Sequence, residues 1–306
     1  MILLFRVLST FVVIVGFVGA AMGQNKATTR DADRRDWLQL FNGKDLTGWD
    51  IKITGQPLND NYKNTFRVED GILRIVYDQY QSFDGKYGHL YYNKPFSHYI
   101  IRFTYRFVGN QTPGGAAWNV RNSGVMIHSQ SAKSLSMKQD FPVSLEIQLL
   151  GGLSKGERHT ANLCTPGTQV YMNGKLNPAH CIDSRSKTYD GDQWVTAEAI
   201  VLGDSVIHHL VEGDTVLTYQ RPEVSSYFVS NDYNWQAAGV DNANEWISRA
   251  NKPLVDGYIA LQAESHPIDF RTVEVLNLKG CMDPKALNYK SYYVKADNTQ
   301  CRYGTK

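Results

Sequence analysis

Apolar side chains occupy every second position from Leu145 to Leu149 in Val143-Ser144-Leu145-Glu146-Ile147-Gln148-Leu149-Leu150. This period of two is typical of a β-strand with one buried face. Glu146 and Gln148 then share the opposite face. That face is either an ordinary exposed surface or the floor of a polar cleft, and other strands must distinguish the two interpretations.

Two further stretches show the same alternation, Val125–His128 and Tyr258–Glu264, and a histidine follows just after the second. If the three strands belong to one sheet, their polar faces form one cleft. Carboxylates, imidazoles and amides gathered in this way suit acid–base or metal chemistry. The candidate residues of this cleft are Glu146, Glu264, His128, His266, Gln148 and Gln262.

The rest of the chain also favours β-structure. Tyr99–Val108 reads as a long strand, and an Asp-Gly turn divides Phe66–Ile75 into a hairpin. No helical period persists, and Asn244–Ala250 is the best candidate for a short helix. Many strands without βαβ alternation predict an all-β fold, a sandwich of two antiparallel sheets packed face to face.

The first residues read as an export signal. Arg6 precedes the apolar run Val7–Met22, and Ala21-Met22-Gly23 offers a cleavage site of small residues. A membrane anchor is the alternative, but the run is short and a processing site follows it. We therefore expect a signal peptide over residues 1–23, a flexible linker over 24–36, and a secreted or periplasmic protein with no stable membrane insertion after cleavage.

The four cysteines of the chain predict two disulfides, because an exported protein meets an oxidising environment. Three pairings are open, and proximity favours Cys164–Cys181 and Cys281–Cys301. Residues 280–306 are too few to bury a core and need such a staple. They resemble small Cys-bounded modules at the ends of surface and secreted bacterial proteins, so we expect a separate tail after a main domain of residues 37–279.

Charge argues against one class of partner. The 32 Lys and Arg against 30 Asp and Glu leave a net charge of +2, and no basic block stands out, so no nucleic-acid partner is expected. The 18 Tyr and 6 Trp offer side chains that stack on sugar rings, although β-sheets favour the same residues.

Four stretches stand in the order found in one known family: Leu40–Trp49, Arg121–His128, Leu145–Leu150 and Gly257–His266, the last followed by Phe270-Arg271. Together they resemble the 3-keto-disaccharide hydrolase family over about residues 37–279. The resemblance implies a concanavalin A-like jelly roll whose concave sheet carries the site. Two segments, 151–186 with His159 and His180 and 223–252, are more elaborate than in ordinary members, which leaves substrate preference open.

The resemblance implies cleavage of a glycoside whose sugar carries a ketone at C3. The ketone acidifies the C2 proton, an enolate forms and expels the C1 substituent, and water adds back. With this chemistry we expect Glu146 or His128 as the base, and Glu264 and His266 as the acid or as metal ligands. The expected substrate contacts, through guanidinium, amide and indole groups, are Arg121, Arg271, Gln148, Gln262 and Trp118.

Two other functions stay open. An ordinary glycoside hydrolase also uses two carboxylates, but Gln148 stands where a laminarinase-type strand has its second acid. A non-catalytic carbohydrate-binding module would not need His128 and Glu146 together. No cofactor is certain, and a divalent metal ion is left open. A carbohydrate substrate is expected, and the resemblance further implies dehydrogenases that make the 3-keto sugar.

Overall fold

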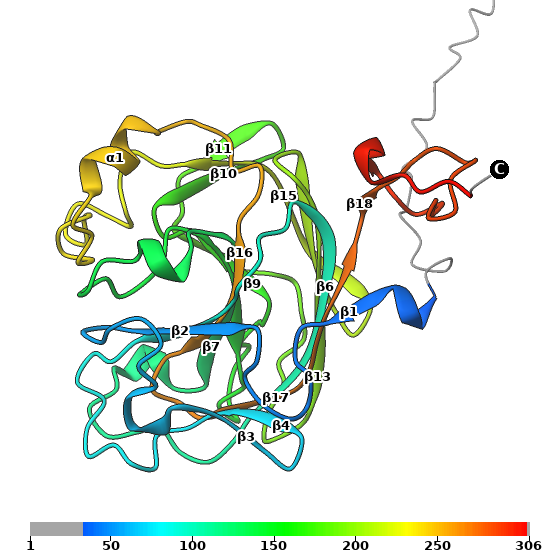
Figure 1. Ribbon diagram of the computed structural model, residues 1–306. Helices are drawn as coiled ribbons and strands as arrows, with labels where there is room; N and C mark the ends of the chain where they lie inside the picture. The colour runs from blue at the N-terminus through cyan, green and yellow to red at the C-terminus, as the bar shows by residue number, and fades with distance from the viewer. Residues whose placement is uncertain (1–32, 305–306) are drawn as a thin grey trace, which may run out of the picture.

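Alternating apolar residues give this chain two large antiparallel sheets whose buried faces meet (Figure 1). The computed structural model describes residues 33–304. The expected all-β fold, a concanavalin A-like jelly-roll sandwich, is confirmed. The expected signal peptide and most of the expected linker lie outside the described residues.

The larger sheet has ten strands. Their order is β11 (Lys175–Asn177), β10 (Thr168–Met172), β15 (Asp214–Val224), β14 (Val206–Val211), β13 (Val195–Leu202), β6 (His98–Phe107), β17 (Ile268–Asn277), β4 (Ile72–Ile75) and β3 (Phe66–Glu69), and β1 (Trp37–Gln39) also pairs with β17. The expected hairpin is confirmed in β3 and β4, where Asp70 and Gly71 take positive φ angles of 52° and 75° at the turn.

The second sheet has seven strands. Their order is β12 (Cys181–Ile182), β9 (Asn162–Cys164), β8 (Leu145–Leu150), β7 (Asn122–Ser129), β16 (Tyr258–Ala263), β5 (Gly88–Tyr92) and β2 (Trp49–Ile53). The remaining elements are short: α1 (Ala243–Ser248), η2 (Arg34–Asp36), η3 (Tyr62–Asn64), η4 (Ala117–Asn119), η5 (Ala132–Ser134), η6 (Asn298–Gln300), β18 (Lys279–Gly280) and β19 (Lys295–Ala296). In residues 33–304 no helix is long and apolar enough to span a membrane.

The core lies between the two sheets. Every second residue of β6, from Tyr99 to Phe107, is buried against the opposite sheet. Strand β8 contributes Leu145, Ile147 and Leu149 to the same core, as the alternation predicts. Since alternate residues point to opposite faces, Glu146 and Gln148 lie on the outer face of the seven-stranded sheet.

Segment 151–186 differs from its sequence pattern. The sequence of this segment has few strand signals, but β9, β10, β11 and β12 are formed. These strands have two to five residues and carry polar side chains, so they give no alternation to detect. The disulfide Cys164–Cys181 joins directly paired residues of β9 and β12 and holds them together.

Segment 223–252 builds an apolar cluster of its own beside the sandwich. Trp235 and Trp246 stack with ring centroids 6.5 Å apart and planes 8° from parallel. The expected short helix is α1, which carries Trp246 into this cluster. In Figure 1 the gold segment around α1 lies on the side of the sandwich opposite to the red tail.

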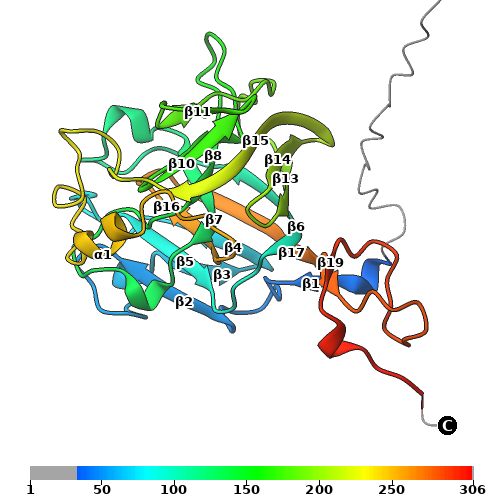
Figure 2. The same cartoon turned by 90° about the horizontal axis from the view of Figure 1, so that it is seen from above.

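The tail after Lys279 lies outside the sandwich (Figure 2). Its cysteines form the expected Cys281–Cys301 disulfide, and β18 pairs with β19 in parallel. The Nζ atom of Lys290 donates to Asp36 over 2.8 Å. This contact ties the tail to η2, the end of the expected linker. We propose that residues 280–306 form a module distinct from the domain of residues 37–279.

Replacing both tail cysteines, Cys281→Ser with Cys301→Ser, tests this boundary. The tail should become a protease substrate, because losing a cross-link over such a loop costs about 3 kcal/mol. Thermal unfolding of the sandwich should stay almost unchanged. Limited proteolysis with mass spectrometry and calorimetry measure the two effects, with Cys164→Ser and Cys181→Ser as the matched control pair. Loss of the sandwich transition would show that the tail belongs to the main domain.

Candidate functional site

The outer face of the seven-stranded sheet carries a row of polar residues in adjacent strands. Gly124 of β7 is paired with Gln148 of β8, which is paired in turn with Asn162 of β9. On the other side, Gln262 of β16 is paired with His89 of β5. Directly paired residues project to the same face, so these strands present one continuous polar strip.

A cavity of about 380 Å³ opens on this face. Its floor holds carboxyl and amide groups from β7, β8 and the end of β16. Its walls hold aromatic rings, a disulfide and residues of the two elaborate segments. The lining residues are Tyr87, Trp118, Asn122, Asp140, Phe141, Glu146, Gln148, Cys164, Pro166, His180, Cys181, Val229, Tyr233 and Glu264.

Two buried carboxyl groups dominate the electrostatics of the cavity. Glu146 is 6% exposed and Glu264 is 2% exposed. Burial raises the pKa of Glu146 above its ordinary value, because removal of water disfavours the charged form. The pKa of Glu264 is raised well above its ordinary value by burial and by the neighbouring Glu146. Such a pair retains a proton, so one member can donate while the other accepts.

Gly124 makes room for the Glu146 carboxyl. A Cβ atom at Gly124 would lie 2.5 Å from Glu146 Oε1, closer than carbon and oxygen can approach. The carboxyl therefore leans across β7, over the position opposite Gln148. This places the Glu146 carboxyl beside the Gln148 amide on the cavity floor.

Two loops provide the aromatic and polar walls. Tyr87 and Trp118 stack with centroids 6.3 Å apart and planes 11° from parallel, and Trp118 is 55% exposed at the opening. The Tyr233 hydroxyl donates to Asp140 Oδ2 over 2.8 Å. Burial raises the pKa of Asp140. This hydrogen bond joins segment 223–252 to the loop before β8.

Comparison with known proteins agrees with this geometry. A family model described as "3-keto-alpha-glucoside-1,2-lyase-like domain" matches residues 36–276. The chain belongs to this family. None of the curated proteins matches the chain. The match spans both large sheets and every lining residue of the cavity. The two-sheet sandwich is thus the 3-keto-alpha-glucoside-1,2-lyase-like domain. Because the chain belongs to this family, the protein is carbohydrate-active and glycosyl hydrolase-like.

Some solved structures are similar to this chain at low sequence identity. A candidate glycosyl hydrolase from Parabacteroides distasonis ATCC 8503 is 19% identical, with 80% of this chain and 97% of that chain covered and a TM-score of 0.45. LamA from Z. galactanivorans, solved with laminaritriose and laminaritetraose, is 9% identical, with coverages of 74% and 91% and a TM-score of 0.41. The exoplasmic/lumenal domain of VIP36, bound to Ca2+/Man3GlcNAc, is 10% identical, with coverages of 79% and 88% and a TM-score of 0.42.

Several residues predicted for the site lie in or beside the cavity of this 3-keto-alpha-glucoside-1,2-lyase-like domain. Glu146, Glu264, Gln148 and Trp118 line it. Gln262 does not line the cavity, and its side chain is fully buried beside Glu146, where it favours the ionised form of that carboxyl. Their catalytic and binding roles stay predictions.

His128 does not lie on the cavity face, and the prediction that it belongs to the polar cleft is wrong. The register between β7 and β16 shifts at this point, and His128 has a φ of 48°. Such a β-bulge inserts one residue and reverses the side on which the next side chain projects. The His128 ring Nε2 consequently lies 3.0 Å from the carbonyl oxygen of Gly203, which belongs to the opposite sheet.

His266 and Arg121 lie together at the end of the sandwich rather than in the cavity. The His266 ring packs edge-on against Phe107 of β6, with centroids 5.7 Å apart. Arg121 lies over the same Phe107 ring and donates to the carbonyl oxygen of Gly191. Burial, with help from Arg121, lowers the pKa of His266 to about 4. The positive φ angles of Ser265 (74°) and Arg121 (48°) turn both segments away from the strip.

Arg271 lies on the ten-stranded sheet, so its expected substrate contact is corrected as well. It belongs to β17, where the register with β6 shifts between Phe270 and Thr272. Its guanidinium lies 5.0 Å from the ring centroid of Trp194. Neither residue lines the cavity. The motif around Arg271 is therefore part of the ten-stranded sheet and does not contribute to the cavity floor.

Sequence reasoning missed several residues of the site. His89 follows the alternation of Gly88–Tyr92 and could have been found by the same period, but a five-residue strand gives a weak signal. Its ring is 1% exposed and burial lowers its pKa to about 3, so it is neutral. The other missed residues, Tyr87, Asp140 and Tyr233, lie in loops. No local sequence pattern indicates that these loops pack next to one another.

The sequence did not decide whether the protein binds a divalent metal ion, and the structure shows which side chains could hold one. Across residues 33–304, one group of three metal-ligating side chains lies within 4.8 Å, Cys164, His180 and Cys181. Its two sulfurs form a disulfide and offer no thiolate. Glu264 Oε2 and His89 Nε2 lack hydrogen-bond partners among the described residues and have suitable ligand chemistry. A metal ion on the cavity floor stays a prediction.

Gly124→Ala tests the close approach of the Glu146 carboxyl in this domain. The added methyl group must displace the carboxyl, because the two would overlap. We expect binding of a sugar ligand to weaken or turnover to fall about 100-fold, as misplacement by about 1 Å does in other enzymes. Calorimetry should show a folded protein. Gly304→Ala, where no atom lies near the added methyl and the backbone is not in the left-handed region, is the control. Equal effects of both changes would contradict the close approach of the Glu146 carboxyl to Gly124.

Proposed function

We propose that this protein cleaves glycosides whose sugar carries a ketone at C3. The observation that carries the proposal is the buried Glu146–Glu264 pair, whose raised pKa values keep a proton on the cavity floor of a 3-keto-alpha-glucoside-1,2-lyase-like domain. A reaction that removes one proton and delivers another needs one ionised and one protonated group.

Glu146 and Glu264 have distinct roles in this scheme. The Glu146 carboxylate accepts the C2 proton, and the electrons of that C–H bond form the enolate of the C3 ketone. The enolate then restores the ketone, forms the C1=C2 double bond and releases the C1 oxygen. The Glu264 carboxyl group gives its proton to that oxygen. Water adding to C1 completes a net hydrolysis, whereas release of the unsaturated sugar makes the reaction an elimination.

The walls suit a substrate with two unlike halves. Carboxyl and amide groups on the floor can bind the oxidised sugar, and the exposed Trp118 can stack on a ring at the opening. The lining also contains apolar groups, namely Phe141, Pro166, Val229 and the Cys164–Cys181 disulfide. We propose that the aglycone packs against these apolar groups.

The proposal extends to the protein's surroundings. A 3-keto glycoside has to be made by oxidation of a sugar hydroxyl, so a sugar 3-dehydrogenase must supply the substrate. Two disulfides fit an oxidising compartment. We therefore propose a secreted or periplasmic location, with residues 1–23 as the signal peptide.

Paired substrates test the reaction. The protein should release the aglycone from 3-keto glucosides and not from the matching unoxidised glucosides, because only the ketone acidifies C2. Glu146→Gln should lower kcat about 100-fold or more, since it removes the base. Glu157→Gln, on a side chain that is 88% exposed, is the matched control. Chromatography of released aglycone, with and without a chelator, measures these effects and the need for a metal ion.

Other outcomes would favour the alternative functions. Release from unoxidised glucosides would indicate an ordinary glycoside hydrolase. Sugar binding without release from either substrate would indicate a carbohydrate-binding module. Unchanged turnover in Glu146→Gln would exclude Glu146 as the base.

The pH dependence follows from the raised pKa values of the two carboxyl groups. Glu146 works only when ionised, so kcat/KM should rise with pH through a pKa above the ordinary 4.5. Glu264 works only when protonated, so the rate should fall again at higher pH. Glu264→Gln should remove this descending limb and slow alkyl leaving groups more than phenolic ones. A pH–rate profile with an ascending limb near pH 4 would contradict the assignment.

A further inference from the structure

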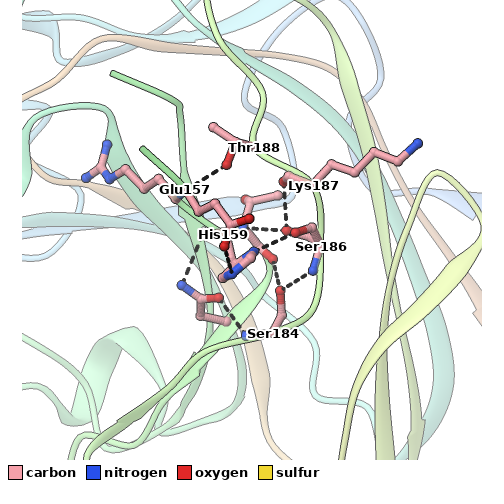
Figure 3. A network of polar contacts seen from close by, with 9 residues as sticks. Glu157, His159, Ser184, Ser186, Lys187 and Thr188 are labelled. Carbon is pink, nitrogen blue, oxygen red and sulfur yellow. Dashed lines mark hydrogen bonds and ion pairs between the residues drawn. The ribbon is translucent and has the colours of Figure 1, made fainter. Parts of the chain in front are cut away.

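One buried amide has its orientation fixed by backbone groups. The Asn162 Oδ1 atom accepts from the backbone N–H of Ser184 over 2.9 Å. Its Nδ2 atom donates to the carbonyl oxygen of His159 over 3.1 Å. A backbone N–H only donates and a carbonyl only accepts, so the amide cannot be reversed without losing both bonds. Figure 3 shows the network of polar contacts to which His159 and Ser184 belong.

The surrounding hydrogen bonds hold this amide in place (Figure 3). The Ser184 hydroxyl donates to the carbonyl oxygen of Thr160 over 2.6 Å, and the Thr160 N–H donates to the Ser186 hydroxyl over 2.7 Å. The His159 ring Nδ1 lies 2.6 Å from the carbonyl oxygen of Ser186. Segment 159–162 is thus tied to segment 184–186 at several points, and Asn162 is 1% exposed.

The fixed amide determines how Gln148 faces the cavity. Asn162 Nδ2 also donates to Gln148 Oε1, over 3.3 Å. The Gln148 carbonyl oxygen is therefore directed at Asn162, and its Nε2 group is left for the cavity that Gln148 lines. Gln148 presents a pure hydrogen-bond donor there. The Glu146 carboxyl lies beside it, over Gly124, the cross-strand partner of Gln148.

We propose that Gln148 Nε2 donates a hydrogen bond to the C3 oxygen of the oxidised sugar, and that Asn162 is the positioning residue that fixes this donor. The inference rests on the proposed function. A ketone oxygen accepts and never donates, so it matches a donor-only group, whereas a hydroxyl would fit either face of an amide. Gln148 and Glu146 both line the cavity, so one sugar ring can present C3 to the donor and C2 to the base.

The donor acts as charge develops. When Glu146 takes the C2 proton, the electron pair of the broken bond moves through C2 and C3 to the C3 oxygen. The hydrogen bond from Gln148 Nε2 to this more negative oxygen shortens, and no proton leaves the amide. A hydrogen bond that strengthens in this way lowers the barrier to enolate formation rather than only improving substrate binding.

Two variants test the pair. Gln148→Met keeps the shape and removes the donor, and Asn162→Asp replaces the donor that holds Gln148 with an acceptor, so that the Gln148 amide reverses. Each should lower kcat for a 3-keto glucoside about 100-fold and change KM less than about threefold. Exchange of the C2 proton with deuterated water should slow equally. Affinity for the matching unoxidised glucoside should not change, and Gln193→Met, outside the cavity, should behave as the wild type.

The outcomes separate the two proposals. Wild-type protein that neither cleaves nor exchanges 3-keto glucosides refutes the proposed function. Wild-type turnover with normal kcat in Gln148→Met refutes the role of Gln148 alone. Normal kcat in Asn162→Asp, with loss in Gln148→Met, refutes the positioning role. Equal losses of affinity for the keto and hydroxy sugars would show a structural role for the amides and also overturn the inference.

Discussion

The site depends on burying two carboxyl groups close together. Glu146 and Glu264 come from β8 and from the end of β16, with β7 between them. Burying two negative charges in this way would cost several kcal/mol, so the pair holds a proton instead. The sandwich tolerates the buried carboxyl pair because its hydrophobic core lies on the other face of the same strands, where Ile147 and Leu261 pack.

The surroundings of the pair also come from distant parts of the chain. Residue Gly124 has no side chain to obstruct Glu146, and Asn162 turns the amide of Gln148 toward the cavity. The Tyr233–Asp140 hydrogen bond ties an inserted segment to the wall. Each of these contacts excludes water or orients a group, which is what a low-dielectric reaction site needs.

The sequence was informative where the β-period was unbroken. Alternation correctly placed Glu146 and Gln148 on the face opposite Ile147, and it did the same for Gln262. It failed at His128, because a register shift lies beside this residue and no single-residue signal reveals it. The substrate contact of Arg271 was implied by the resemblance, and it failed because β17 belongs to the other sheet. The positions of loop residues such as Tyr87 and Asp140 could not be predicted for another reason. They depend on how separate loops pack together, which no local pattern encodes.

The Cys164–Cys181 bridge has a practical meaning for anyone who handles the protein. Both cysteines line the cavity, and they join β12, a strand of only two residues, to β9. Protein made in a reducing cytosol would lack this disulfide at the edge of the sheet but would keep its large hydrophobic core. It would therefore look folded by spectroscopy and yet have an ill-defined pocket. Whether the two cysteines are oxidised during expression and purification therefore affects every later assay of the cavity.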